Sequence, residues 1–181
     1  TEAKTRGFPV IALYDGSIIP WSVEKMSDGY QDSFVARLEE ILGAFKSASI
    51  PLIGYISQSR SSDIVNMLRT YICPYEKSNC MEHCGHLNEE DFPCSRVWPL
   101  TDRTLLETQL EVNQFSGIFQ SGAKAANLLE ERFKVCFTYA RFESEVARLE
   151  MPGWLQENRD LLNLALAALA SQVKKGYGYP V

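Results

Sequence analysis

An aspartate stands where a predicted buried strand reaches the surface. Asp15 follows an apolar run and precedes Gly16 in the stretch FPVIALYDGSIIPW, residues 8–21. Short apolar runs are typical of buried strands, and Asp-Gly is a strong turn signal. A carboxylate at that point can hold a hard cation such as Mg²⁺ or Mn²⁺, which prefers oxygen ligands. The other interpretation is an ordinary turn aspartate, because Asp-Gly hairpins are common.

Four cysteines within 22 residues form the densest group of potential metal-binding side chains in the sequence. They are spaced C-x6-C-x3-C-x9-C at Cys73, Cys80, Cys84 and Cys94, with His83 and His86 between them. Four soft ligands in a polar insert, residues 72–98, indicate a structural metal site holding Zn²⁺ or an iron–sulfur cluster. Disulfides and free thiols are the alternatives. The fifth cysteine, Cys136, lies in an apolar run and is predicted to be a core residue.

A polar turn after the second apolar run is a candidate phosphate site. The run PLIGYIS, residues 51–57, predicts a buried strand, and the turn that follows carries Arg60. Free backbone N–H groups at the start of the next helix would favour an anion there. Ser57, Ser59 and Arg60 are the candidate contacts. The alternative is ordinary helix capping by Ser61 or Ser62.

The elements that would position these residues alternate between strand and helix. Strand, helix and strand over residues 8–57 predict a parallel pair with a crossover helix. The later segments predict helices at 62–71, 101–110, 123–132 and 157–175, and strands at 18–23, 134–141 and 144–150. The last two strands form a hairpin, in which Glu145, Arg148 and Glu150 are expected to share one face, so that Arg148 can pair with either carboxylate. The other interpretation is a ladder of surface ion pairs. The fold class is therefore α/β.

Composition excludes several classes of protein. The chain has 181 residues, 45% of them hydrophobic and 23% charged, which is ordinary for one soluble globular domain. No apolar run approaches the roughly 20 residues that span a bilayer, and no secretory signal is visible. The net charge of −5 argues against a basic footprint over the whole protein. No P-loop, Rossmann or Gly-x-Ser-x-Gly motif is present.

Four separated blocks, taken in order, resemble the NurA nuclease family in its bacterial form, common in cyanobacteria and related phyla. They are ALYDGSIIPW, IPLIGYISQSRSSDIVNMLR, EVARLEMPGW and GYGYPV, spread between residues 8 and 181. The resemblance implies an RNase H-like core with a mixed central sheet flanked by helices, into which the cysteine-rich loop is inserted. It makes residues 1–181 a single, partial nuclease domain.

The resemblance also implies a function. NurA-like proteins are Mn²⁺- or Mg²⁺-dependent nucleases that act on DNA ends in double-strand break repair, partner a HerA-like hexameric ATPase and form homodimers. Asp15 matches a metal-binding catalytic aspartate, and Tyr179 matches the tyrosine of a Gly-Tyr-Pro motif near the active site. Ser57, Ser59 and Arg60 become candidate DNA contacts. The expected location is the cytoplasm.

Two departures from the family lead to a further expectation. An acidic motif and a glutamate expected before Asp15, and a histidine expected after Tyr179, are not in this sequence. Two-metal phosphoryl chemistry needs several converging carboxylates. We therefore expect a fragment whose isolated chain is inactive or nearly so. The alternative functions are a non-catalytic protein-interaction module stapled by metal in its cysteine-rich insert, and a small metal-binding regulatory protein.

Overall fold

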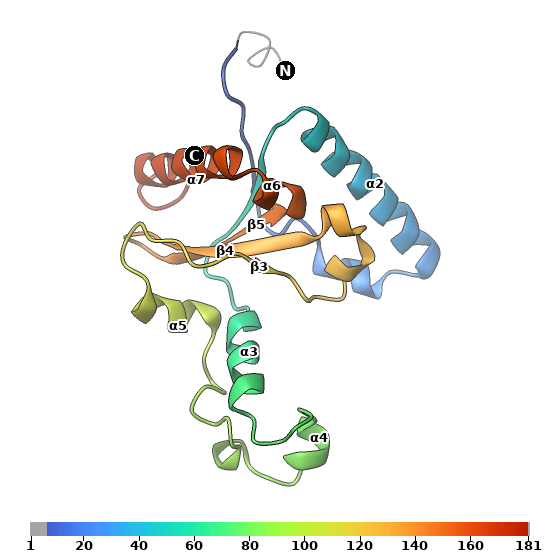
Figure 1. The fold of residues 1–181 in the computed structure, drawn as a ribbon, viewed down its shortest axis with the longest axis vertical. Coiled ribbons are helices and arrows are strands. Elements are labelled where there is room, and N and C mark those ends of the chain that lie inside the picture. The colour runs from blue at the N-terminus through green and yellow to red at the C-terminus, as the bar shows by residue number, and fades with distance from the viewer. Residues whose placement is uncertain (1–6, 181) are drawn as a thin grey trace.

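A mixed five-stranded sheet organises the fold of the computed structural model, which describes residues 7–180 (Figure 1). The sheet order is β1-β2-β5-β4-β3. β1 and β2 are parallel, and every other neighbouring pair is antiparallel. The strands span Ala12–Asp15 (β1), Leu52–Ile56 (β2), Phe119–Gln120 (β3), Val135–Arg141 (β4) and Val146–Pro152 (β5).

The β4–β5 hairpin forms the centre of the sheet. Its sequences, VCFTYAR and VARLEMP, are rich in the β-branched and aromatic residues that favour strands. Successive side chains alternate between faces, so Phe137 and Tyr139 face one layer while Cys136 and Ala140 face the other. Every residue of β5 is buried, which makes this strand the part of the sheet best shielded from water.

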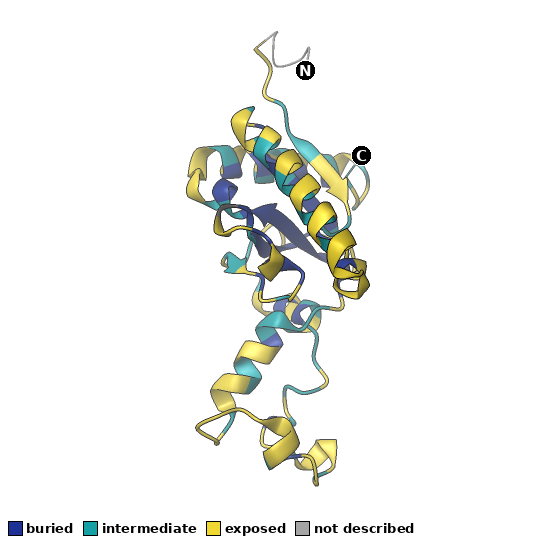
Figure 2. Ribbon diagram, turned by 90° about the vertical axis from the view of Figure 1, so that its right-hand side faces the viewer, coloured by how far each residue is buried: buried dark blue, intermediate teal, exposed yellow. Residues whose placement is uncertain are grey.

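Helices cover one face of the sheet with the main hydrophobic core. The short helix α6 (Gly153–Glu157) and the long helix α7 (Arg159–Lys175) follow β5 directly, and α2 (Asp28–Ser47) packs beside them (Figure 1). Leu162 and Leu169 of α7 and Leu42 of α2 are almost completely buried in this core. The alanines of α7 favour helix and allow close packing. In Figure 2 the buried strands lie behind the largely exposed outer surface of α2.

A smaller core lies on the opposite face. Helices α3 (Asp63–Ile72) and α5 (Asp102–Gln109) place Ile64 and Leu106 against Phe137 and Tyr139. A capping box between Thr101 and Thr104 begins α5. The hydrophobic cores on the two faces of the sheet therefore differ in size, and the face with the smaller core also carries buried charged side chains.

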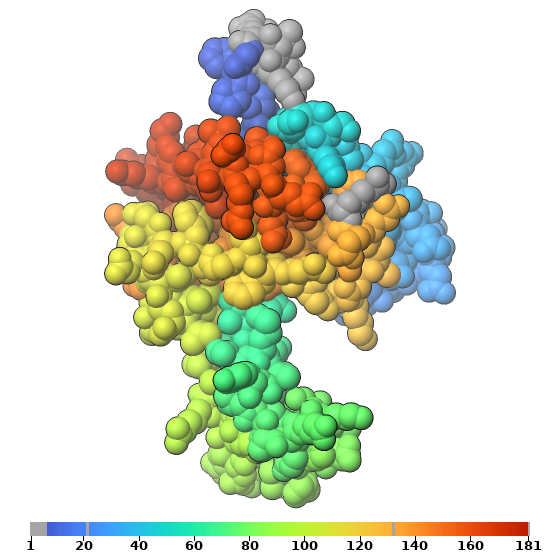
Figure 3. All heavy atoms as spheres, viewed as in Figure 1, coloured from blue at the N-terminus to red at the C-terminus, as the bar shows by residue number. Residues whose placement is uncertain are grey.

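Residues 72–98, here called the insert lobe, connect α3 to α5 and stand away from the sheet. The lobe contains α4 (Cys80–His83) and the 3₁₀ turn η2 (Glu89–Asp91). Figure 3 shows it as a separate protrusion joined to the body by a narrow neck. The three remaining 3₁₀ turns span Trp21–Lys25, Ala126–Leu128 and Glu131–Phe133. None of the helices in residues 7–180 has the length and apolar character needed to cross a membrane.

The α/β class, the mixed sheet, the parallel β1–β2 pair and the β4–β5 hairpin confirm the sequence prediction. Two predicted elements were wrong. The strand expected at 18–23 is replaced by buried Ile18 and Ile19 and then a 3₁₀ turn that starts after Pro20. The helix expected at 123–132 breaks into two 3₁₀ turns. Side chains from other elements hold the backbone there, since Glu24 accepts from the Ala125 N–H (3.0 Å) and Glu39 accepts from the Glu130 N–H (2.6 Å).

Candidate active site at the end of the first strand

The turn after β1 fixes the direction of the Asp15 side chain. Asp15 is the last residue of β1 and lies beside Tyr55 of β2 in the register. The Gly16 N–H donates to the Tyr55 carbonyl at 2.9 Å, and Gly16 has φ of 124°, a conformation that side chains disfavour. The chain then crosses over Gly54, where an added Cβ would lie 2.7 Å from the Gly16 carbonyl oxygen. Both glycines are therefore needed for this path.

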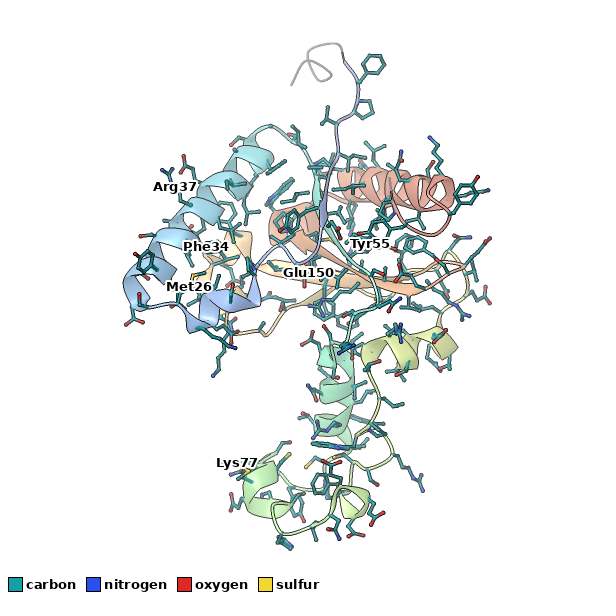
Figure 4. All side chains as sticks on the ribbon, turned by 180° about the vertical axis from the view of Figure 1, so that it is seen from behind. Met26, Phe34, Arg37, Tyr55, Lys77 and Glu150 are labelled. Atoms are coloured by element: carbon teal, nitrogen blue, oxygen red, sulfur yellow. The ribbon has the colours of Figure 1, made fainter. Side chains whose placement is uncertain are left out.

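A buried carboxylate of β5 anchors residues 16–18, here called the crossing segment because they pass over Gly54. Oε2 of Glu150 accepts from the Ser17 hydroxyl (2.8 Å) and from the Ile18 N–H (3.1 Å). The three residues Asp15-Gly16-Ser17 thus have distinct structural roles. The first presents a carboxylate, the second makes the turn and the third fastens the turn to the sheet. Figure 4 shows Glu150 close to the middle of the sheet.

Arginine 148 completes this anchor on the same face of the sheet. Its Nε donates to Oε1 of Glu150 at 3.0 Å, and its Nη1 donates to Asp63 at 2.5 Å. The guanidinium also stacks on the Phe137 ring at 3.8 Å. Burial by itself lowers the pKa of Arg148, but Glu150, Tyr139 and Asp63 raise it overall. The arginine is therefore a buried cation paired with two carboxylates.

The expected pairing of Arg148 with a carboxylate on its own face is confirmed for Glu150, but the placement of Glu145 on that face was wrong. Residues three apart on a strand point to opposite faces, so Glu145 lies on the α7 side of the sheet. There it accepts from the Tyr55 hydroxyl (2.9 Å), the Ser57 hydroxyl (2.8 Å) and the Gln58 N–H (3.0 Å). Counting residues from Leu149, which is on the face covered by α7, would have shown this.

Tyr179, which is distant from Asp15 in sequence, contacts it in the fold. Its hydroxyl donates to Oδ1 of Asp15, a contact between residues 164 apart in sequence. This hydrogen bond first, then burial and the charges of Asp15 and Glu145, raises the pKa of Tyr179 to about 12. The tail that carries the ring turns through Tyr177 and Gly178, both with positive φ, and its Gly178 N–H donates to the Val173 carbonyl at 2.9 Å.

Tyrosine 55 links the two carboxylates. Its ring packs edge-on against that of Tyr179, with centroids 5.2 Å apart, while its hydroxyl donates to Glu145. Burial, the hydrogen bond to Glu145 and the charges of Glu145 and Tyr179 raise the pKa of Tyr55 well above its usual range. Both tyrosines therefore stay protonated at neutral pH and act as hydrogen-bond donors between Asp15 and Glu145. Neither Tyr55 nor Glu145 was singled out as a site residue from the sequence.

A cavity of about 490 Å³ opens beside these groups. Asp15, Tyr55 and Tyr179 lie on its wall together with apolar residues of the N-terminal segment and of α7. Within residues 7–180, however, no group of three or more His, Cys, Asp or Glu side chains could hold a metal ion as arranged. The site therefore offers Asp15 to a hard cation, and Glu145 is a second carboxylate, connected to Asp15 through the contact between the Tyr55 and Tyr179 rings.

The three candidate phosphate contacts lie in different environments. Ser57 is exposed and bonded to Glu145, whereas Ser59 is buried and its hydroxyl donates to that of Ser61 at 3.0 Å. Arg60 is exposed. Because β1 and β2 are parallel, the turn that carries these residues leaves the sheet at the same edge as Asp15. Of the three, only Arg60 offers a charged side chain to an incoming phosphate.

The four cysteines of the insert lobe lie far from Asp15 but close to one another. Cys73, Cys80, Cys84 and Cys94 line one cavity of about 240 Å³, and all four are free thiols. Burial, followed by the charges of Cys80, Cys94 and Cys73, raises the pKa of Cys84. Cys136 is buried in β4, as predicted.

The chain matches the family model of the NurA domain over residues 6–181. It belongs to the NurA domain family. No curated protein and no solved structure matches it. Membership places this NurA chain in a family of nucleases that act on DNA and generally depend on metal ions.

Proposed function

We propose that this NurA chain contributes to a Mn²⁺- or Mg²⁺-dependent nuclease site that processes DNA ends, with Asp15 as a metal ligand. The observation that carries the proposal is the hydrogen bond from Tyr179 to Asp15, which joins the first strand to the end of the chain. Two residues that the family resemblance assigned to one site are thus in contact, beside an open cavity. A plain turn aspartate has no need of such a partner.

Each side chain has a task in this proposal. A bound cation would polarise a phosphate oxygen and activate water. Asp15 would be a ligand of that cation, and its Oδ1 accepts from the Tyr179 hydroxyl. Because the pKa of Tyr179 is raised to about 12, its proton stays in place at neutral pH and orients the carboxylate. Arg60 offers a charge to the DNA backbone at the same edge of the sheet.

The proposed site needs more carboxylates than residues 7–180 bring together. Two-metal chemistry requires several ligands that clamp the attacking and leaving oxygens. Since no three candidate ligands converge within residues 7–180, we propose that the isolated chain is inactive or nearly so. We further propose that the protein forms a homodimer and works with a HerA-like hexameric ATPase on broken DNA ends in the cytoplasm. We also propose that its core is RNase H-like, which the mixed sheet supports.

The proposal is tested by Mn²⁺ binding and by DNA cleavage. We expect the chain to bind Mn²⁺ weakly in a titration followed by electron paramagnetic resonance. Asp15→Asn should lose this binding, and Asp32→Asn, an exposed carboxylate of α2, should keep it. Equal Mn²⁺ binding by Asp15→Asn and the parent chain would overturn the assignment. So would cleavage of linear duplex DNA that survives in Asp15→Asn.

DNA binding is measured separately, because charge alone can produce it. Arg60→Gln should weaken binding of linear DNA at low salt and reduce the salt dependence by about one phosphate contact. Arg37→Gln, on the exposed side of α2, should leave both unchanged. If the chain binds neither Mn²⁺ nor DNA, the alternative function, a protein-interaction module with no chemistry, is favoured instead.

A further inference from the structure

The insert lobe has almost no hydrophobic core. Across residues 72–98, all of which the structure describes, the only buried residues are Cys84 and Cys94, at 7% and 9% exposure. Figure 2 shows the lobe as mostly exposed chain. Its helix α4 has four residues, and its other ordered features are ring contacts such as Tyr75 on His83 at 4.0 Å. Domains this small usually need a covalent or metal staple.

The four thiols come from three separate segments and meet around one cavity. Cys73 follows the end of α3, Cys80 begins α4 and Cys84 directly follows it, and Cys94 lies in the turn before α5. The Cys84 N–H donates to the Cys80 carbonyl at 2.9 Å, and both residues line the same cavity. The remaining wall is formed by Asn66, Arg69, Thr70, Ser78 and Pro93. The cysteines therefore occupy the place where a core would be.

We infer that Cys73, Cys80, Cys84 and Cys94 bind one zinc ion as four thiolates and that the insert lobe closes around it. Closed sets of four cysteines are a standard structural zinc site, with Zn–S bonds of about 2.3 Å. No ready ligand group exists among the described side chains, and the cavity of about 240 Å³ is much larger than one ion. Binding must therefore draw the thiols inward and release their protons, so zinc affinity falls at low pH.

The test measures metal content and lobe closure in the whole chain. Protein prepared with zinc and then desalted should contain one zinc per chain by elemental analysis. Cys84→Ser should lose that zinc, and Cys136→Ser should keep it, because this fifth cysteine is buried in β4. Replacement by Co²⁺ should give the visible bands of a tetrahedral thiolate complex.

A second measurement keeps the inference testable if Cys84→Ser misfolds. In the unaltered chain, zinc should slow thiol labelling at the four lobe cysteines and slow proteolysis of residues 72–98, and a chelator should restore both rates. Absence of zinc, two disulfides in the purified chain, or iron together with sulfide would each overturn the inference. Asp15→Asn should leave zinc content unchanged, so failure here is distinguishable from failure of the Mn²⁺ site.

Discussion

At the scale of single residues, the site depends on how charges and hydroxyls are paired. Asp15 and Glu145 each accept from a tyrosine, and those two rings contact each other. On the other face of the sheet, Glu150 and Arg148 neutralise each other and hold the turn that carries Asp15. The catalytic candidate is thus exposed and directed by a tyrosine, while its support is buried and ionic.

The pKa of Tyr179 provides a prediction at this scale. Since it is raised to about 12, the folded chain holds this proton more tightly than the unfolded chain. The stabilisation is present below about pH 10, the ordinary tyrosine pKa. It is lost as the pH rises from there through about 12. Tyrosinate formation is followed by ultraviolet absorption in the parent chain and in Tyr179→Phe, and the difference between the two titrations reports on Tyr179 alone. That tyrosine should ionise near pH 12 in the parent chain. In an Asp15→Asn background it should ionise nearer pH 10. Titration near pH 10 in the parent chain would contradict the hydrogen bond.

Removing the buried cation gives a second prediction. Arg148→Met should lower the free energy of unfolding by about 3 to 5 kcal/mol, because Glu150 is left buried without its partner. The matched control is Arg37→Met, whose pair with Glu40 is exposed at 78% and 68% and should be worth less than about 1 kcal/mol. Urea unfolding followed by circular dichroism measures both. If both variants lost the same free energy of unfolding, burial of the Arg148–Glu150 pair would not increase the cost of breaking it.

At the scale of elements, the crossing of two backbones decides where Asp15 points. The segment after β1 passes over β2 at Gly54 and is fastened to β5 through Glu150. Three strands therefore meet at one turn. A side chain at residue 54 would push the crossing segment away from β2, because the nearest atom belongs to the backbone of Gly16.

Gly54→Ala tests this crossing. The added methyl would overlap a backbone oxygen, so we expect a loss of about 1 to 3 kcal/mol in the free energy of unfolding and weaker Mn²⁺ binding at Asp15. Gly29→Ala is the control, since it has open space around it in the first turn of α2 and should be neutral or slightly stabilising. Unchanged stability in Gly54→Ala would mean that the crossing segment moves freely.

Local pattern was enough to predict most elements, and long-range pairing explains the failures. The alternation of β4 and β5 and the alanine-rich stripe of α7 are local signals, and both elements formed as expected. The segment 123–132 has a helical composition, but acceptors on Glu24 and Glu39, about ninety or more residues earlier, hold it in another shape. Asp15 and Tyr179 were assigned by resemblance. Their contact, and the roles of Tyr55 and Glu145, required the fold.

At the scale of the whole molecule, a well-packed sheet is joined to a lobe with two buried residues. The net charge of −5 leaves little general attraction for DNA, so any DNA contact must be local. Figure 3 shows how little of the lobe touches the body. Local stability should therefore differ strongly between the two parts.

Hydrogen exchange measures that difference directly. In metal-free protein we expect the amides of β4 and β5 to exchange slowest, through global unfolding, and those of residues 72–98 to exchange fastest. The hydrogen bonds of the lobe are short-range and close to solvent, as in the turn that joins the Val97 N–H to the Cys94 carbonyl at 3.0 Å. Slow exchange throughout a metal-free lobe would show that its contacts suffice without a staple.

The contact between Tyr179 and Asp15 also bears on how the protein is made. During synthesis, the first strand leaves the ribosome long before β5 supplies Glu150 and before the tail supplies Tyr179, 164 residues later. Contacts so distant in sequence form late, because closing the long loop has an entropic cost. The carboxylate therefore stays without its two supports until residues 150 and 179 have emerged from the ribosome. A chain that lacked β5 and the tail would carry Asp15 in a strand held only by its pairing with β2.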